Sequence, residues 1–144
     1  MRLLKLVLIL VFIVGFTSLS KAKGYLPAKI YMFGFAASFN DSTVYFTDIQ
    51  EVNAYVNNDR NHFLVGRSAY SFQLRNYLQT SKRSLYPTCV TVYATTKAEI
   101  NKKYLAIKKK YLPISKGKAK GTNRYFIETI PISEFAYSIS KPIE

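Results

Sequence analysis

The sequence predicts a mixed α/β (α+β) domain, a two-layer sandwich in which one sheet of about four strands carries two helices in the order ββαβαβ. Three observations predict this class. Runs of β-branched and aromatic residues alternate with turn formers, and two segments place large apolar side chains at helical spacing. In addition, 49% of the residues are hydrophobic and 15% aromatic, which supplies a packed core, and 144 residues suit one domain.

The first 22 residues have the pattern of a cleavable signal peptide. Arg2 and Lys5 precede the uncharged apolar run 6–16, and a small-x-small cleavage site ends at Ala22. A retained anchor is the alternative, but the run is shorter than the roughly 20 residues that span a bilayer. No cysteine stands at the cleavage site after the run, so lipoprotein processing is not expected. We therefore expect a signal peptide over 1–22, a single domain over 23–144, and export to the periplasm or the medium without a membrane span.

The first half of the domain reads as a hairpin followed by a helix. Residues 29–38 are almost continuously apolar, as in a central strand buried on both faces, and Gly34 within them indicates a bulge or close packing. Turn formers at 39–42 lead into a second strand over 43–49. The signal weakens over 51–66. A helix that ends by about residue 84 is then predicted by a stripe of apolar side chains, Tyr70, Leu74, Tyr77 and Leu78.

The second half reads as strand, helix and strand. Residues 88–95 predict a third strand, and the capping box from Thr96 to Glu99 predicts a helix start. The helix carries a second apolar stripe, Ile100, Tyr104, Ile107 and Tyr111, and Pro113 ends it. A lysine-rich loop and a fourth strand over 124–130 follow. The third and fourth strands could pair in parallel with a right-handed crossover, and we expect both helices to cover the same face of the sheet.

Basic residues concentrate in one segment of the chain. Loss of Arg2, Lys5 and Lys21 with the leader would reduce the formal charge from +13 to +10, and residues 97–124 hold +9 of it. This predicts an anion-binding patch made of Lys102, Lys103, Lys108, Lys109, Lys110, Lys116, Lys118 and Lys120. Its partner could be lipopolysaccharide phosphate, an anionic glycan, acidic lipid heads or a protein. The alternative is a solvated helix face.

Nucleic acid is not the expected partner of this patch. The segment has one arginine, Arg124, and its tyrosines lie on the stripe that the helix buries, so base stacking is not offered.

Evidence for catalysis is sparse. One Cys and one His make no metal cluster, and no cofactor is expected. A hydrolase would have to use Asp48, Glu51 or His62, and His62 also lies between Asp59 and Ser68, which are triad residue types. Cys89 stands in an apolar run and is expected to be buried.

The first predicted helix carries two arginines. Arg67 and Arg75 could clamp a carboxylate, but an ion pair within the fold is favoured.

Aromatic residues of the first two strands have three interpretations. If one sheet face stays uncovered, they form a carbohydrate platform or a homo-oligomer interface, and otherwise they belong to the core. The residues are Tyr31, Phe33, Phe35, Tyr45 and Phe46.

Three segments carry a resemblance. At 39–50 (FNDSTVYFTDIQ), 70–78 (YSFQLRNYL) and 88–90 (TCV) the chain resembles small exported proteins of Bacteroidales bacteria that have no assigned function. This resemblance implies a bacterial, exported protein and no particular activity.

A weaker likeness concerns the second half of the chain. The strand, the capped helix after Thr96 and the last strand are similar to the second half of peptidoglycan-binding domains of the sporulation-related repeat type. Those domains have the order βαββαβ, from which the ββαβαβ order expected here departs.

Together these observations favour a non-catalytic binding or accessory module of the cell envelope, with a basic helix and loop for an anionic partner. The alternatives are a small hydrolase-like enzyme that uses Asp48, Glu51 or His62, and a homo-oligomeric structural protein with an aromatic interface.

Overall fold

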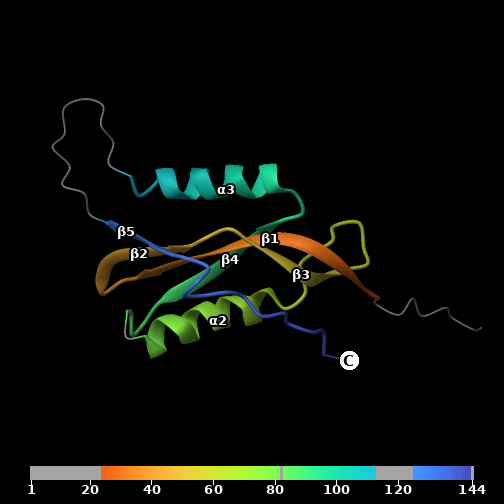
Figure 1. Ribbon diagram of the computed structural model, residues 1–144, viewed down its shortest axis with the longest axis horizontal. Coiled ribbons are helices and arrows are strands. Elements are labelled where there is room, and N and C mark those ends of the chain that lie inside the picture. Colours follow the sequence, from red (N-terminus) through yellow and green to blue (C-terminus); the bar gives the residue numbers. More distant parts are fainter. Residues whose placement is uncertain (1–23, 82, 113–124, 144) are drawn as a thin grey trace, which may run out of the picture.

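The computed structural model describes residues 24–81, 83–112 and 125–143, and it confirms the mixed α/β class with five strands and two helices (Figure 1). The expected signal peptide and the lysine-rich loop lie outside the described residues. The elements are β1 (Tyr25–Ser38), β2 (Asp41–Thr47), β3 (Gln50–Asn57), α2 (Arg67–Thr80), β4 (Thr88–Ala94), α3 (Lys97–Lys109) and β5 (Phe126–Ile130). The expected order is found, with β3 as an additional strand.

Strand β3 lies in the segment where the sequence signal was weak. Its buried side chains, Val52, Ala54 and Val56, alternate with more exposed ones, which is the period of a half-buried strand. Asn53 is exposed and Asn57 is partly exposed, and both dilute the pattern because asparagine is a poor strand former. The strand forms because it continues the hairpin: it pairs antiparallel with β1 from Tyr25↔Asn57 to Met32↔Gln50.

Strand β1 is the centre of the sheet, as its apolar sequence predicts. β4 pairs antiparallel with one edge of β1 from Tyr31↔Ala94 to Ala37↔Thr88, and β3 and β2 follow each other along the other edge. β5 pairs in parallel with the far side of β2. The parallel pairing suggested for the strands that flank α3 is therefore wrong: β4 and β5 run in the same direction, but β1 and β2 lie between them.

The expected two-layer arrangement needs correction, because helices cover both faces of the sheet (Figure 1). Ile30, Met32 and Ala36 of β1 pack toward α2, in one cluster with Tyr70, Leu74 and Leu78. The alternate residue Phe33 packs toward α3, in a second cluster with Ile100 and Tyr104. Both predicted helical stripes are thus in contact with the core, but on opposite sides of one sheet.

In the part of the chain that the structure describes, the helices and the clusters beneath them cover the aromatic residues of both sheet faces. Tyr45 belongs to the α2 cluster, and the other candidates for a platform or interface, Tyr31, Phe33, Phe35 and Phe46, belong to the α3 cluster. None of the described helices is long and apolar enough to cross a bilayer.

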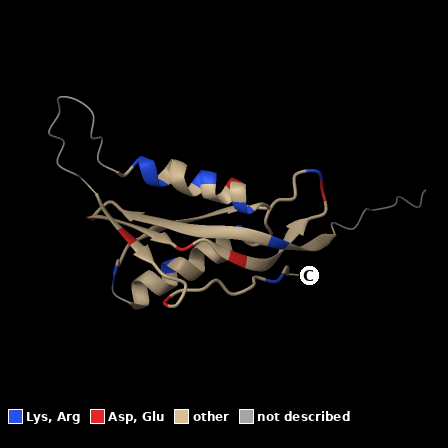
Figure 2. Cartoon of the chain, turned by 45° about the horizontal axis from the view of Figure 1, so that its top comes forward, with Lys and Arg blue, Asp and Glu red and all other residues tan. Residues whose placement is uncertain are grey.

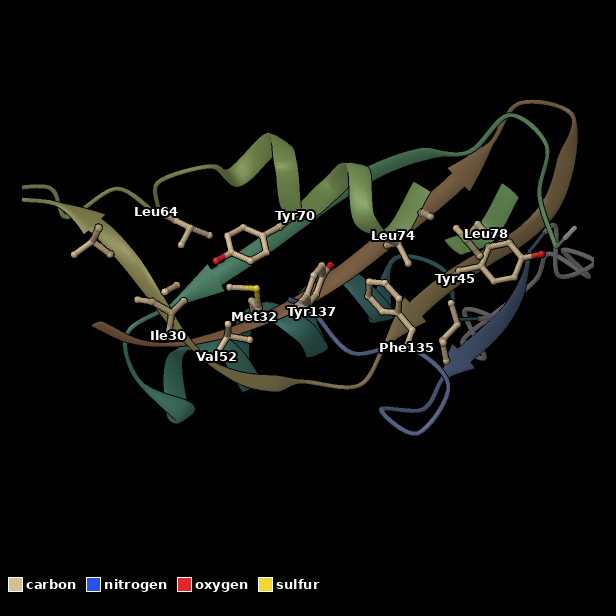
Figure 3. Close-up of a cluster of buried hydrophobic side chains, with 14 residues drawn as sticks. Ile30, Met32, Tyr45, Val52, Leu64, Tyr70, Leu74, Leu78, Phe135 and Tyr137 are labelled. Carbon is tan, nitrogen blue, oxygen red and sulfur yellow. The ribbon is translucent and has the colours of Figure 1, made fainter. Parts of the chain in front are cut away.

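The C-terminal tail completes the core on the α2 side. Phe135 and Tyr137 are buried beside Tyr70 and Leu74 (Figure 3). The side-chain amide of Gln50 bridges two backbone groups of the tail: it donates to the carbonyl of Phe135 at 2.9 Å and accepts from the N–H of Tyr137 at 2.8 Å. A glutamine side chain therefore takes the place of a neighbouring strand for this segment.

The two helices begin differently. The Thr96 hydroxyl caps α3 by accepting from the Glu99 N–H at 3.3 Å, as the capping box predicts. The Glu99 carboxylate pairs with Lys103 at 2.8 Å. Helix α2 begins without a side-chain cap, after Gly66 at φ +69°.

Candidate functional site

Helix α3 displays the described part of the predicted basic patch. Cations recur along its length, with Glu99 as the acidic residue among them (Figure 2). The predicted members on α3 and at its C-terminal end are Lys102, Lys103, Lys108, Lys109 and Lys110, and Lys97, which was not among them, is the first residue of the helix. The other three predicted members, Lys116, Lys118 and Lys120, lie outside the described residues.

Two of these lysines are engaged within the fold. The ammonium of Lys103 donates to the carbonyl of Tyr93 at 3.0 Å and pairs with Glu99. Lys108 lies 5.3 Å from the centre of the Tyr104 ring, a cation–π distance. Their charges still contribute to the electrostatic potential around α3, but their side chains already contact groups of the same chain.

The other three lysines project into solvent. Lys102, Lys109 and Lys110 are exposed, and none of them forms an ion pair with a described residue. Helical spacing places Lys102 and Lys109 on the side of α3 opposite the buried stripe, and Lys110 on its flank.

Two leucines share the outward side of α3 with these lysines. Leu105 is 54% exposed and Leu112, in the turn after the helix, is 47% exposed. We name the set Lys102, Leu105, Lys109, Lys110 and Leu112 the outer face of α3. It combines positive charge with apolar side chains that are about half exposed.

The buried side of α3 holds this outer face in place. The Tyr104 ring meets Phe33 edge-on at a centroid distance of 4.9 Å, and Phe46 at 5.5 Å. Tyr111, just past the helix end, packs at 5.2 Å from Phe35. Aromatic pairs of this kind stabilise beyond their buried area, so the orientation of the lysines is set by the core.

The candidate catalytic carboxylates have structural partners. Asp48 accepts from the N–H of Ile132 at 3.1 Å and so fixes the turn after β5. Glu51 forms a 3.0 Å ion pair with Lys29 across the β1–β3 ladder. This contact lowers the pKa of the Glu51 carboxyl and raises the pKa of Lys29, the opposite of what a proton-donating acid needs.

His62 is not brought together with these carboxylates. It is exposed at a positive φ of 46°, and its Nδ1 lies 3.3 Å from the carbonyl of Asn57. Asp59 accepts from the backbone N–H groups of Asn61 and His62, which closes the loop. Neither Asp48 nor Glu51 lines the shallow cleft beside His62. Ser68 lines a different cleft, so the triad residue types are dispersed.

The structure reveals a second cleft that the sequence analysis did not predict. It lies between one flank of α2 and the chain leading into β4, and has a volume of about 790 Å³. Arg67 and Arg75 line it, and the favoured ion pair within the fold is not found for either of them among the described residues. Arg67, Ser71 and Arg75 are four residues apart, and this spacing places them on one flank of the helix in the sequence. The opposite wall, from Tyr86 to Val90, is brought to this flank only by tertiary packing.

Cys89 lies in the same cleft. It is half-buried rather than fully buried, and burial raises the pKa of its thiol to about 11. The thiolate is therefore scarce at neutral pH, which disfavours nucleophilic chemistry.

No group of His, Cys, Asp and Glu side chains within the described ranges could hold a metal ion. Comparisons of the chain with protein-family models, with curated proteins and with solved structures gave no match.

Proposed function

We propose that the protein is an exported bacterial binding module without catalytic activity, and that the outer face of α3 binds anionic phospholipid head groups at a cell-envelope membrane. The observation that carries the proposal is the pairing of uncommitted lysines with exposed leucines on one side of a firmly packed helix.

Charge alone would suit any anion, but the leucines favour a membrane surface. A helix that binds at a membrane interface presents cations to the head groups and inserts apolar side chains at the acyl boundary. Leu105 lies between Lys102 and Lys109 on the same side of α3, so both contacts are available in one orientation. Binding of a dissolved phosphate or glycan would not require the apolar side chain of Leu105.

Export fits the same proposal. The pattern of residues 1–22 is that of a signal peptide that directs export, and the likeness to exported Bacteroidales proteins agrees with it. The charge that remains after processing is concentrated in residues 97–124, which include α3. A protein with this distribution approaches an anionic surface with α3 foremost.

The test is a vesicle-binding experiment with the chain 23–144. Phosphatidylcholine vesicles with and without phosphatidylglycerol are sedimented, and the bound fraction is measured at low and high salt. We expect binding that requires phosphatidylglycerol and weakens with salt. The triple variant Lys102→Gln/Lys109→Gln/Lys110→Gln should lower the partition coefficient on the order of a hundredfold, since each lysine contributes about 1 kcal/mol.

A matched control removes the same charge elsewhere. Arg60→Gln/Arg75→Gln/Lys141→Gln loses three exposed cations that lie outside α3, and it should bind much more tightly than the α3 triple variant. Leu105→Ser keeps every charge and should weaken the binding that persists at high salt. Equal binding by both triple variants would contradict a role for α3, and an unchanged Leu105→Ser variant would contradict insertion into a membrane.

A further inference from the structure

A second binding site follows from the cleft between α2 and β4, independently of α3. One wall is the flank of α2, with Arg67, Ser71, Phe72 and Arg75, and the other is the entry into β4, with Tyr86 and Cys89. Its volume of about 790 Å³ is in the range of ligand sites. None of the described residues that line it is acidic.

The floor of this cleft is an open sheet edge. Among the described strands, β4 pairs with β1 alone. In an antiparallel ladder, successive residues direct their backbone groups alternately to the partner and away from it. The N–H of Thr91 donates to the hydroxyl of Ser71, which shows that the odd-numbered residues of β4 direct theirs to the open edge. Cys89 shares this direction.

Side chains close the open edge at Thr91 but not at Cys89. The carbonyl of Thr91 accepts from Nε of Arg67 at 2.8 Å, and its N–H meets Ser71 at 3.0 Å. No described side chain makes a comparable bond to the N–H or the carbonyl of Cys89. A donor and an acceptor are therefore presented side by side in the cleft, spaced as a strand residue presents them.

Charge and apolar surface surround this pair of backbone groups. Arg75 is exposed and has no ion pair with a described residue, and among bonds to described residues the Arg67 guanidinium makes one, through Nε. Phe72 is 64% exposed and Tyr86 is 71% exposed. Arginine with exposed aromatic residues is the combination enriched at protein interaction sites.

We propose that this cleft binds a short extended peptide segment with an acidic side chain. One peptide residue pairs its N–H and carbonyl with Cys89, the carboxylate of a neighbouring residue binds Arg75, and an apolar side chain packs between Phe72 and Tyr86. Arg67 and Ser71 end the pairing at Thr91, so the bound segment is short. The occupant is recognised by strand addition together with carboxylate binding.

The experiment uses a fluorescent, end-blocked peptide of sequence Ser-Val-Glu-Val-Ser as the probe, with the chain 23–144. Binding is measured by anisotropy, and the backbone amide of Cys89 is followed by NMR. A probe with Gln for Glu tests the carboxylate, a probe N-methylated at both valines, the neighbours of the Glu, tests strand pairing, and blocked glutamate alone tests a small-molecule ligand. Arg75→Gln is compared with Arg60→Gln, which removes an exposed arginine outside the cleft.

We expect the Gln probe and the Arg75→Gln variant each to weaken binding on the order of tenfold, the lower bound for loss of a hydrogen bond to a charged group. N-methylation should weaken it similarly, Arg60→Gln should not, and the Cys89 amide should shift on binding. Equal binding of the Gln probe, or unchanged binding by Arg75→Gln, would overturn the carboxylate contact. Full binding of the N-methylated probe or of blocked glutamate, or no binding of any probe at millimolar concentration, would overturn the peptide site.

Discussion

Gly34 occupies a point where the hairpin is irregular and crowded. Phe35 pairs with Phe46 and Met32 with Gln50, so three residues of the partner chain oppose two of β1 between these pairs. At this bulge the Gly34 N–H donates to the Thr47 hydroxyl at 2.8 Å. A Cβ on Gly34 would meet Leu74 Cδ2, and would lie 2.5 Å from the Tyr137 hydroxyl. The glycine is needed because α2 and the tail both approach the backbone here.

At the residue scale, Gly34→Ala should lower the free energy of unfolding by about 1–3 kcal/mol, the usual cost of overpacking a core. Urea denaturation monitored by circular dichroism measures this. Tyr137→Phe removes one of the crowding atoms, so the double variant should be more stable than the sum of the single effects predicts. Strict additivity would show that the Tyr137 contact does not limit this site.

Strand β4 has an exposed edge that two helices protect. Side chains of α2 occupy the backbone groups of Thr91, and Lys103 of α3 binds the carbonyl of Tyr93. Unpaired edges invite association with other strands, and covering them with side chains is a common safeguard. These bonds protect the edge at Thr91 and Tyr93 and leave Cys89 unprotected. The peptide site proposed above is short for this reason.

At the element scale, Ser71→Ala should destabilise the protein by about 1–3 kcal/mol, because it leaves the N–H of the fully buried Thr91 without its acceptor. Thermal and urea unfolding check this value. Ser68→Ala, on the exposed flank of the same helix, is the control and should stay within about 0.5 kcal/mol of the parent. Equal stability of the two variants would mean that the edge contact contributes little.

The C-terminal tail joins the sheet to α2 across the whole molecule. Gln50 of β3 holds the tail at Phe135 and Tyr137, and Gln73 of α2 both accepts from the N–H and donates to the carbonyl of Ser138. Two glutamine amides thus satisfy the backbone of a segment that has no strand partner. The core on this side is complete once the tail is in place.

At the scale of the molecule, removal of residues 132–144 should abolish cooperative unfolding. Loss of a buried aromatic side chain costs about 3–5 kcal/mol, and two such losses match the stability of a typical domain. Circular dichroism melts of the truncated chain test this. A chain ending at Ser140 keeps Phe135, Tyr137 and Ser138, and should melt as the parent does. A cooperative melt of the shorter chain would contradict the role assigned to the tail.

Periodicity in the sequence was enough to locate most elements. The two apolar stripes predicted both helices, and the apolar run around Phe33 predicted the central strand. The same run already indicated burial on both faces, which conflicts with a two-layer sandwich and agrees with the observed layers. The β3 signal is weak because its asparagines interrupt the alternation expected of a strand. The segment is nevertheless a strand because it pairs with β1 along its whole length.

The sequence by itself determined which side of each helix is apolar, that Gly34 marks a bulge or close packing, and that the positive charge is concentrated in residues 97–124, because these properties depend on residue identity and short-range spacing. The tertiary structure alone decided that the helices cover opposite faces, that β4 has an open edge beside Arg75, and that Gln50 and Gln73 hold the tail. The reason is physical: these features arise from contacts between segments far apart in the chain, and the spacing within one segment does not encode which distant surface it meets.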